Sequence, residues 1–501
     1  MQSRKSIFED FIEKASLYDL VPLVREMPGD LDTPLGCYMK LKNAYPGSPS
    51  FLLETAQTGR NSGRYSMIGI DPLFVFTGHG GRISMRGVIE REKISEDPLL
   101  ELRIALGELS CAPVSTDAGF AGGVVGYIGY DMVRFFEKLP GAQAPDIDTP
   151  DICFLFPEKL VIIDSFTGNR TLLLFVCTKD KENLPDAYRR GVGLLDGFAR
   201  AVEGALRNVE APALSVSEPQ AMVSREDFEE TVRRAKKYIV SGDIIQVVLS
   251  QRFCCLASCD ALSLYRALRR INPSPYMFLL DLIDHSLIGS SPETLVKLTG
   301  GQIELKPIAG TRRRGRDFQE DRDLERELLA DEKERAEHVM LVDLARNDAG
   351  RAARVGTVAV RDLMSVDRYS HVMHIVSSVH AEIAEGLDAF DVFRAAFPAG
   401  TVTGAPKVRA MEIIDELENH RRGFYAGAVG YFAANGDMDF CITIRTMLKK
   451  DGSLYFQAGA GIVADSVPER EYDETLFKLQ ALVDAITGKK ERGGYHASYD
   501  R

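Results

Sequence analysis

The sequence predicts an α+β fold in which antiparallel β-sheets form a sandwich-like core and helices pack outside it. Two observations support this prediction. Short glycine-containing turns separate strand-like segments, and amphipathic segments carry the signals of helix starts and stops. With 501 residues the chain is too long for one compact core, so we expect more than one domain.

Two-residue turns divide the second half of the chain into strands. Gly300–Gly301, Asn435–Gly436 and Asp451–Gly452 each lie between two strand-like segments. Turns of this type join neighbouring antiparallel strands. We therefore predict a three-stranded meander over residues 427–463, followed by a helix from about Pro468 to Ile486.

The first half shows similar strand-like segments. One of them, AGGVVGYIGY (121–130), resembles AGAVGYFAA (426–434) in the second half. A single echo of this kind is weak support for a duplicated fold, and we give it little weight.

Helical segments alternate with the strands and help to place the domain boundaries. Ser224 and Asp227 form a capping-box pattern before an apolar stripe at helical spacing. A long charged helix is expected over about residues 321–347. Residues 205–222 contain two prolines and several small residues without periodicity, which predicts a boundary. We expect an N-terminal domain over 1–215, a second domain over 216–488 and a disordered tail over 489–501.

Composition and charge exclude several classes of protein. The net charge of −12 disfavours nucleic-acid binding, because an anionic surface repels phosphates. The sequence contains no apolar run of the ~18–20 residues that a membrane helix needs. The N-terminal segment carries acidic residues where a signal peptide would be apolar. We therefore expect a soluble, cytoplasmic protein that binds neither nucleic acid nor membrane.

Two predicted helices each carry a pair of glutamates three residues apart, Glu334 with Glu337 and Glu471 with Glu474. The first pair shares a helix face with apolar residues such as Leu341. An inward carboxylate is costly unless it is paired or bound to a metal, and Mg²⁺ prefers oxygen ligands of this kind. The alternative is that these glutamates are solvated, with those near a helix start favoured by the helix dipole.

Arg445, His374 and two glycines are further candidates for contact with a ligand. Alternation along FCITIRTML turns Arg445 toward one face of a strand, where it would bind a carboxylate or lie in solvent. Gly459 and Gly461 leave backbone N–H groups open to a ligand, or mark a bulge or tight packing. His374 lies in an apolar run and is either a catalyst or a satisfied core residue.

Taken in order, the motifs of residues 224–487 resemble those of one enzyme family. They are KPIAGTRRRGR (306–316), AEHVMLVDLARND (336–348), VMHIVSSV (372–379), FPAGTVTGAPK (397–407), RRGFYAGAVGY (421–431), ITIR (442–445), QAGAGIV (457–463) and E-x-x-E (471–474). This ordered set is similar to the chorismate-binding domain of anthranilate synthase component I and its relatives. In the first half, FLLETAQTGRNSGRYSMIG (51–69) resembles the family segment that helps to bind the feedback inhibitor tryptophan.

The resemblance implies a lyase that converts chorismate and ammonia to anthranilate and pyruvate with Mg²⁺, in the first committed step of tryptophan biosynthesis. It implies that Glu334, Glu337, Glu471 and Glu474 hold the metal, and that His374, Glu293 and Thr401 are catalytic, with Glu293 as general acid. The implied substrate contacts are Gly310, Thr311, Tyr425, Arg445, Gly459, Ala460, Gly461 and Lys478. The implied tryptophan contacts are Leu53, Glu54, Thr55, Pro275, Tyr276 and Met277.

Two positions distinguish the reactions of the family. Aminodeoxychorismate synthases usually carry Lys where this chain has Ala309, and the water-using enzymes carry a basic Lys where it has Gln246. A glutamine cannot activate water as a base, so both positions favour anthranilate synthase. Thr55 departs from the usual Ser, which leaves the affinity for tryptophan open.

The resemblance also implies partners and leaves two alternatives. Ammonia from glutamine would be supplied by a separate glutamine amidotransferase subunit, component II, so we expect a hetero-oligomer inhibited by L-tryptophan. The alternative enzyme is aminodeoxychorismate synthase component I, and an alternative of another class is a non-catalytic tryptophan-binding regulator. The regulator is disfavoured because the glutamate pairs, His374 and Arg445 are all present.

Overall fold

The computed structural model describes residues 6–55, 63–114, 116, 118–141, 145–181, 183–206, 214–368 and 372–488. The predicted disordered tail, residues 489–501, lies outside these residues. In the described part of the chain, no helix has both the length and the apolar character needed to cross a membrane.

Two groups of antiparallel strands share the long strands β3 (Tyr65–His79) and β7 (Ile152–Asp164). The register between β3 and β7 shifts near Pro72, so the two halves of this pair belong to different groups. The first group contains β4 (Arg82–Gly87), β5 (Arg91–Ile94), β6 (Gly123–Ile128), β13 (Thr294–Thr299), β14 (Gln302–Leu305), β15 (Ile308–Arg313), β16 (Ala359–Arg368), β17 (Val372–Glu382), β19 (Ala428–Ala433) and β20 (Met438–Ile442). The second contains β1 (Leu20–Pro28), β2 (Ser50–Glu54), β8 (Asn169–Cys177), β9 (Gln220–Ala221), β10 (Gln246–Leu256), β11 (Tyr276–Asp281), β12 (His285–Ser291), β18 (Gly404–Ala405), β21 (Thr446–Lys450) and β22 (Ser453–Ile462).

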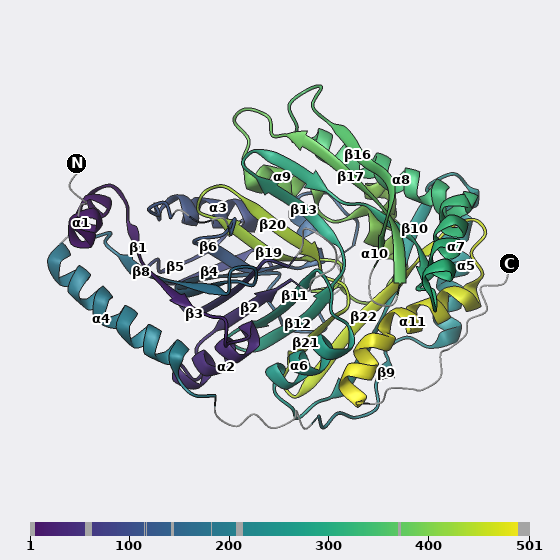
Figure 1. Cartoon of the computed structure of the whole chain (residues 1–501). Helices are drawn as coiled ribbons and strands as arrows, with labels where there is room; N and C mark the ends of the chain where they lie inside the picture. Colours follow the sequence, from purple (N-terminus) through teal and green to yellow (C-terminus); the bar gives the residue numbers. More distant parts are fainter. Residues whose placement is uncertain are drawn as a thin grey trace.

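Apolar residues of both strand groups meet in the largest buried cluster, beside a second large cluster between the second group and helices such as α4 (Leu184–Glu203) and α6 (Ala261–Ile271). Phe154 and Phe440 from the first group join Phe278 and Leu280 from the second in the largest cluster. Helices cover the strands on both sides (Figure 1), so the predicted α+β fold with helices outside the sheets is confirmed. The helices are α1 (Ile7–Leu17), α2 (Pro34–Ala44), α3 (Pro98–Gly107), α4 (Leu184–Glu203), α5 (Arg225–Val240), α6 (Ala261–Ile271), α7 (Phe318–Ala330), α8 (Glu332–Gly350), α9 (Ala389–Ala396), α10 (Lys407–Leu417) and α11 (Pro468–Thr487), with 3₁₀ turns η1 (Tyr130–Phe135) and η2 (Gly400–Val402).

The three predicted turns each join antiparallel strands, but the meander over residues 427–463 has four strands instead of three. The segment expected to be one strand breaks between β20 and β21. Arg445 adopts a left-handed backbone with φ of 49° at this break. Strand β20 pairs with β13 and β19, whereas β21 pairs with β12 and β22, so the chain passes here from one strand group to the other.

The predicted helix after Ser224 is confirmed, and the Ser224 hydroxyl accepts the N–H of Asp227. The long charged helix is instead two helices, α7 and α8. Asp331 separates them because its extended backbone ends α7, and its carboxylate caps α8 by accepting the N–H groups of Lys333 and Glu334.

The two segments that echo each other in sequence lie side by side. Strands β6 and β19 pair antiparallel, with Gly126 opposite Gly430 at the centre. A Cβ atom on Gly126 would lie 1.9 Å from the carbonyl oxygen of Cys153, so the backbones approach too closely for any side chain there. Strands of the predicted first and second domains therefore pair directly, and the boundary near residue 215 stays a prediction.

Candidate active site

Gly310 forms the corner at which several predicted site residues meet. Its backbone is left-handed, with φ of 63°, at an irregularity between β15 and β17. His374 on β17 donates from Nδ1 to the Gly310 carbonyl at 2.9 Å and lies 3.1 Å from the Thr311 hydroxyl. A Cβ atom on Gly310 would lie 3.1 Å from a carboxylate oxygen of Glu334. Glycine at this position thus lets His374, Thr311 and Glu334 converge.

The chemical state of His374 follows from these contacts. Burial and the nearby Arg445 charge lower the pKa of His374 below its ordinary value, so the ring is neutral at pH 7. Because Nδ1 carries the hydrogen that it donates to Gly310, the lone pair lies on Nε2. A neutral imidazole held in this tautomer is suited to act as a general base.

The four glutamates predicted to bind metal lie on α8 and α11, and their charges affect one another. Burial, followed by the charges of Glu334 and Glu474, raises the pKa of Glu337. Burial also raises the pKa of Glu471, to which the charge of Glu474 adds. The like charges around Glu337 and Glu471 are unfavourable in the folded chain, and a bound cation would relieve their repulsion.

In each glutamate pair, one carboxylate already forms an ion pair with an arginine or lysine side chain. Glu334 accepts from Arg312 at 3.3 Å, and Glu474 pairs with Lys478 at 2.7 Å. As placed, the described residues contain no group of three His, Cys, Asp or Glu side chains that could hold a metal ion. The four carboxylates are nonetheless of the donor type that Mg²⁺ prefers, so they fit this ion in chemistry and in shared charge.

Glu293, between β12 and β13, is the most perturbed carboxyl group near these residues. Burial raises its pKa to about 7, although Thr401 and the charges of Arg445 and Lys478 oppose the shift. It lines a small cavity together with Thr401 from η2 and with Leu344 and Ala345 from α8. A carboxyl group with this pKa is partly protonated at neutral pH and is suited to be a general acid.

A glycine-rich stretch of β22 forms another wall of the site. A Cβ atom on Gly459 would lie 2.8 Å from the Tyr425 hydroxyl, and one on Gly461 would lie 2.6 Å from the Gln246 amide. Lys478 donates to the Gly459 carbonyl at 2.9 Å. The glycines therefore admit two polar side chains to the backbone, with Ala460 buried between them. The strand is regular here and pairs with β10, so the alternative of a bulge is wrong.

Arg445 lies near the same residues but not on a strand. Its charge affects the pKa of both Glu293 and His374. Strand alternation was the wrong basis for its orientation, because β20 ends at Ile442 and β21 begins at Thr446. The left-handed backbone of Arg445 at the break, and not a strand periodicity, sets the direction of the side chain.

The predicted tryptophan contacts come together on two paired strands. Met277 of β11 lies opposite Glu54 of β2, with Pro275 and Tyr276 just before Met277 and with Leu53 and Thr55 on either side of Glu54. The Glu54 carboxylate is buried and accepts from both Tyr265 and Arg269 on α6. It therefore holds this end of β2 in place against α6.

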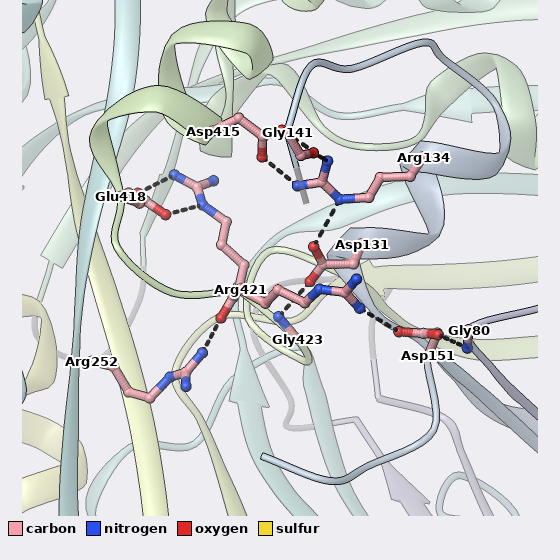
Figure 2. Close-up of polar contacts among 11 residues, drawn as sticks. Gly80, Asp131, Arg134, Gly141, Asp151, Arg252, Asp415, Glu418, Arg421 and Gly423 are labelled. Carbon is pink, nitrogen blue, oxygen red and sulfur yellow. Dashed lines mark hydrogen bonds and ion pairs between the residues drawn. The ribbon is translucent and has the colours of Figure 1, made fainter. Parts of the chain in front are cut away.

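The loop between α10 and β19, which carries Tyr425, is fixed by buried charges that the sequence did not reveal. Asp131 accepts the N–H of Gly423 at 2.9 Å and bonds to Arg134, which pairs with Asp415 (Figure 2). Arg421 lies within 4.0 Å of Asp151 (Figure 2). Asp131, Arg134 and Asp151 come from the first half of the chain, so this network joins the two halves.

Arg422 in the same loop is nearly fully buried. It bonds to both carboxylate oxygens of Glu418, at 2.9 and 2.7 Å, and donates to the carbonyls of Val402 and Val248. Its guanidinium lies over the ring of Tyr425, 5.6 Å from the centroid. The only local signal for this role was a pair of arginines beside an otherwise apolar segment.

Comparison with known proteins agrees with this arrangement. The family profile described as chorismate binding enzyme matches residues 32–484. Anthranilate synthase component 1 of Acetivibrio thermocellus is 44% identical over 478 residues, covering 94% of this chain and 96% of the relative. That of Aquifex aeolicus is 45% identical over 480 residues, covering 94% and 95%.

Solved structures give the same result. Anthranilate synthase component I from Streptococcus pneumoniae superposes with a TM-score of 0.74 at 34% identity, covering 86% of this chain and 94% of that one. The menaquinone-specific isochorismate synthase of Escherichia coli shares the fold, with a TM-score of 0.70 at 19% identity over 96% and 98% of the two chains. This chain therefore belongs to the chorismate-binding enzymes, in the group of anthranilate synthase component I.

Proposed function

We propose that the chain is a lyase that converts chorismate and ammonia into anthranilate, pyruvate and water, and that it uses Mg²⁺. The observation that carries this proposal is the pairing of a general acid with a neutral base. Glu293 has a pKa of about 7, and His374 presents Nε2 in a fixed tautomer. Two titratable groups whose environments suit opposite proton transfers are typical of an acid–base active site.

Chorismate carries two carboxylates, and the site offers cationic and backbone donors for them. Arg445, Lys478 and the N–H groups of Gly459 to Gly461 would hold one carboxylate, with Tyr425 and Thr311 beside the ring. Glu334, Glu337, Glu471 and Glu474 would hold Mg²⁺, which when bound supplies positive charge for the other carboxylate. Lys478 is already fixed by the Gly459 carbonyl, so little reorganisation is needed on binding.

The chain's own residues then move two protons. Ammonia attacks ring carbon C2 while Glu293 gives its proton to the C4 hydroxyl, which leaves as water, and the new C2 ammonium group then returns a proton to the Glu293 carboxylate. His374 Nε2 next takes the proton from C2, the bond from C3 to the enolpyruvyl oxygen breaks as the ring becomes aromatic, and the released enolpyruvate takes up a proton to become pyruvate. Each proton transfer by a positioned side chain is typically worth ~10²–10⁴-fold in rate.

Gln246 supports an amination over the hydroxylation carried out by water-using relatives. It lies close to Gly461, in the wall of the site, and its amide has no basic lone pair to activate water. Ammonia is itself a nucleophile and needs no such base. Ala309 offers no amine nucleophile, which disfavours the aminodeoxychorismate alternative.

We also propose that component II, a glutamine amidotransferase, supplies ammonia in a cytoplasmic hetero-oligomer.

We further propose that L-tryptophan inhibits the enzyme by binding where β2 meets β11. Thr55 follows Glu54 at the end of β2, opposite the Pro275–Met277 segment. The change Thr55→Phe should fill this space and abolish inhibition by tryptophan while activity without tryptophan stays within about twofold of wild type. Unchanged inhibition in this variant would place the regulatory site elsewhere.

The reaction itself is tested with the purified chain, chorismate, an ammonium salt at alkaline pH and Mg²⁺, by following anthranilate fluorescence. The chain contains no Trp, so its own emission is weak. We expect a signal that disappears with a chelator and returns with Mg²⁺. Consumption of chorismate without anthranilate would favour aminodeoxychorismate synthesis, and no consumption would favour a binding protein.

A further inference from the structure

A polar contact buried between α8 and β17 has no role in the proposed chemistry. His338 of α8 and Ser377 of β17 are both fully buried, and His338 Nε2 lies 2.6 Å from Ser377 Oγ. The other ring nitrogen of His338 is buried and has no hydrogen-bond partner among the described residues. A buried polar group with an unmet hydrogen bond costs stability, so an apolar side chain would serve packing alone better.

The contact also holds an irregular stretch of β16. The N–H of Met364 donates to the same Ser377 hydroxyl at 2.9 Å. Met364 has a left-handed backbone, with φ of 56°, where the register between β16 and β17 shifts. Ser377 therefore fixes two neighbours at once, α8 on one side and the irregular part of β16 on the other.

The position of His338 on α8 connects this contact to the proposed site. His338 follows Glu337 directly and lies one helical turn after Glu334, on the same face. Glu334 approaches Gly310 on β15, and the Gly310 carbonyl holds His374, which lies on β17 three residues before Ser377. A slide of α8 along β17 would move the carboxylates away from Gly310 and His374.

We infer that His338 is a positioning residue, which together with Ser377 locks α8 onto β17 and so places Glu334 and Glu337 against the Gly310–His374 corner. The inference rests on the proposed function, because it assigns a purpose to the placement of the proposed metal ligands. It requires no proton transfer at His338. The hydrogen bond to Ser377 fixes the helix in either neutral tautomer.

The test compares two substitutions at His338 in the full chain. His338→Leu removes the hydrogen bond, whereas His338→Gln keeps a polar group at the reach of Nε2. With Mn²⁺ as the probe and electron paramagnetic resonance as the readout, His338→Leu should weaken binding about 10-fold. His338→Gln should restore at least half of that loss on a logarithmic scale.

Ser377→Ala keeps the test decisive if His338→Leu does not fold. It should weaken Mn²⁺ binding at least as much, and a double variant with His338→Leu should be no worse than Ser377→Ala alone, because the serine substitution already removes the contact with His338. Ser378→Ala is the matched control, since the next side chain points to the opposite face of β17 and should leave Mn²⁺ affinity unchanged.

A lower Tm with wild-type Mn²⁺ affinity in His338→Leu and Ser377→Ala would overturn the inference, since it would show a role in stability alone. Mn²⁺ affinity that falls equally in Ser378→Ala would also overturn it. Failure of the proposed function is distinguishable, because the wild-type chain would then form no anthranilate.

Discussion

Two sets of buried or partly buried carboxylates in this molecule, Glu418 at the junction of the two halves and the glutamates of the proposed active site, have opposite surroundings. At the junction of the two halves, Glu418 is paired with Arg422. Burial alone would raise the pKa of Glu418, but the charge and hydrogen bonds of Arg422 hold it below its ordinary value. In the proposed active site, burial and like charges raise the pKa of Glu337 and of Glu471 instead.

The difference separates a structural role from a functional one. In the buried Glu418–Arg422 pair each charge balances the other, so this pair does not need an ion from solution. The active-site carboxylates carry more negative charge than their neighbours balance, which makes the folded chain less stable until a cation or a proton arrives. Glutamate thus stabilises the fold at the junction, and in the proposed active site we expect it to bind a cation.

The largest expected effect comes from removing a charge at the active site. Glu337→Gln should lower kcat/KM for chorismate by at least about 10⁴-fold, which is about 5.4 kcal/mol in the barrier. It should leave Tm unchanged or higher, because it relieves repulsion from Glu334 and Glu474. Anthranilate fluorescence and a thermal melt measure the two quantities. Glu332→Gln, on the exposed start of the same helix, is the control and should behave like wild type.

The matching change at the junction should act on stability and not on metal binding. Glu418→Gln leaves the buried guanidinium of Arg422 without its counter-charge, which should cost about 3–5 kcal/mol. Urea denaturation measures this loss. Glu416→Gln, two residues before Glu418 at the end of α10, removes an exposed ion pair with Arg234 of α5 and should cost less than about 1 kcal/mol. Equal losses in the two variants would show that the buried pair stabilises the fold no more than the exposed pair.

Added metal should stabilise the chain only through the proposed active site. At about 100 times its Kd, Mg²⁺ should stabilise the wild-type chain by about 2.7 kcal/mol, because it binds only the folded site. The stabilisation should vanish in Glu337→Gln and persist in Glu332→Gln. A similar gain in all three proteins would mean that Mg²⁺ binds elsewhere.

The smallest effect is a pH dependence from Glu293. If Glu293 is the general acid, as we propose, it must carry its proton, so kcat/KM for chorismate at constant free ammonia should fall about tenfold per pH unit above pH 7. Its raised pKa also favours folding below the unfolded value near 4.5, and this contribution is lost as pH rises toward 7. Without metal, Glu293 should therefore make Tm lower at pH 7 than at pH 5. In a Glu293→Gln variant, the contributions of Glu293 to the fall in kcat/KM and to the fall in Tm should both be absent.

Local signals explain which elements the sequence could predict. The helix after Ser224 and the turns at Gly300, Asn435 and Asp451 depend on residues within a few positions, and they appear as expected. The cap at Asp331 was also local, since Asp331 and Glu334 have capping-box spacing, but the acidic run around it masked the signal. The break at Arg445 depends on partners in two different strand groups, which no local pattern reveals.

The same limit applies to the site. The proposed metal and substrate residues could be named from motif resemblance, and the structure brings Glu334, His374 and Thr311 to one corner at Gly310. Their supporting contacts could not be named in advance. Asp131 and Gly423, for example, meet across 292 positions of sequence, and nothing near either residue indicates the other.

The direct pairing of β6 with β19 and of β2 with β11 has a consequence for any attempt to divide the protein. A fragment that begins near residue 216 would expose two long backbone edges that were covered in the intact chain. Bare edges of this kind recruit strands from other molecules. Cutting the chain at the predicted boundary near residue 215 should therefore yield aggregates and not a smaller enzyme without the proposed regulation.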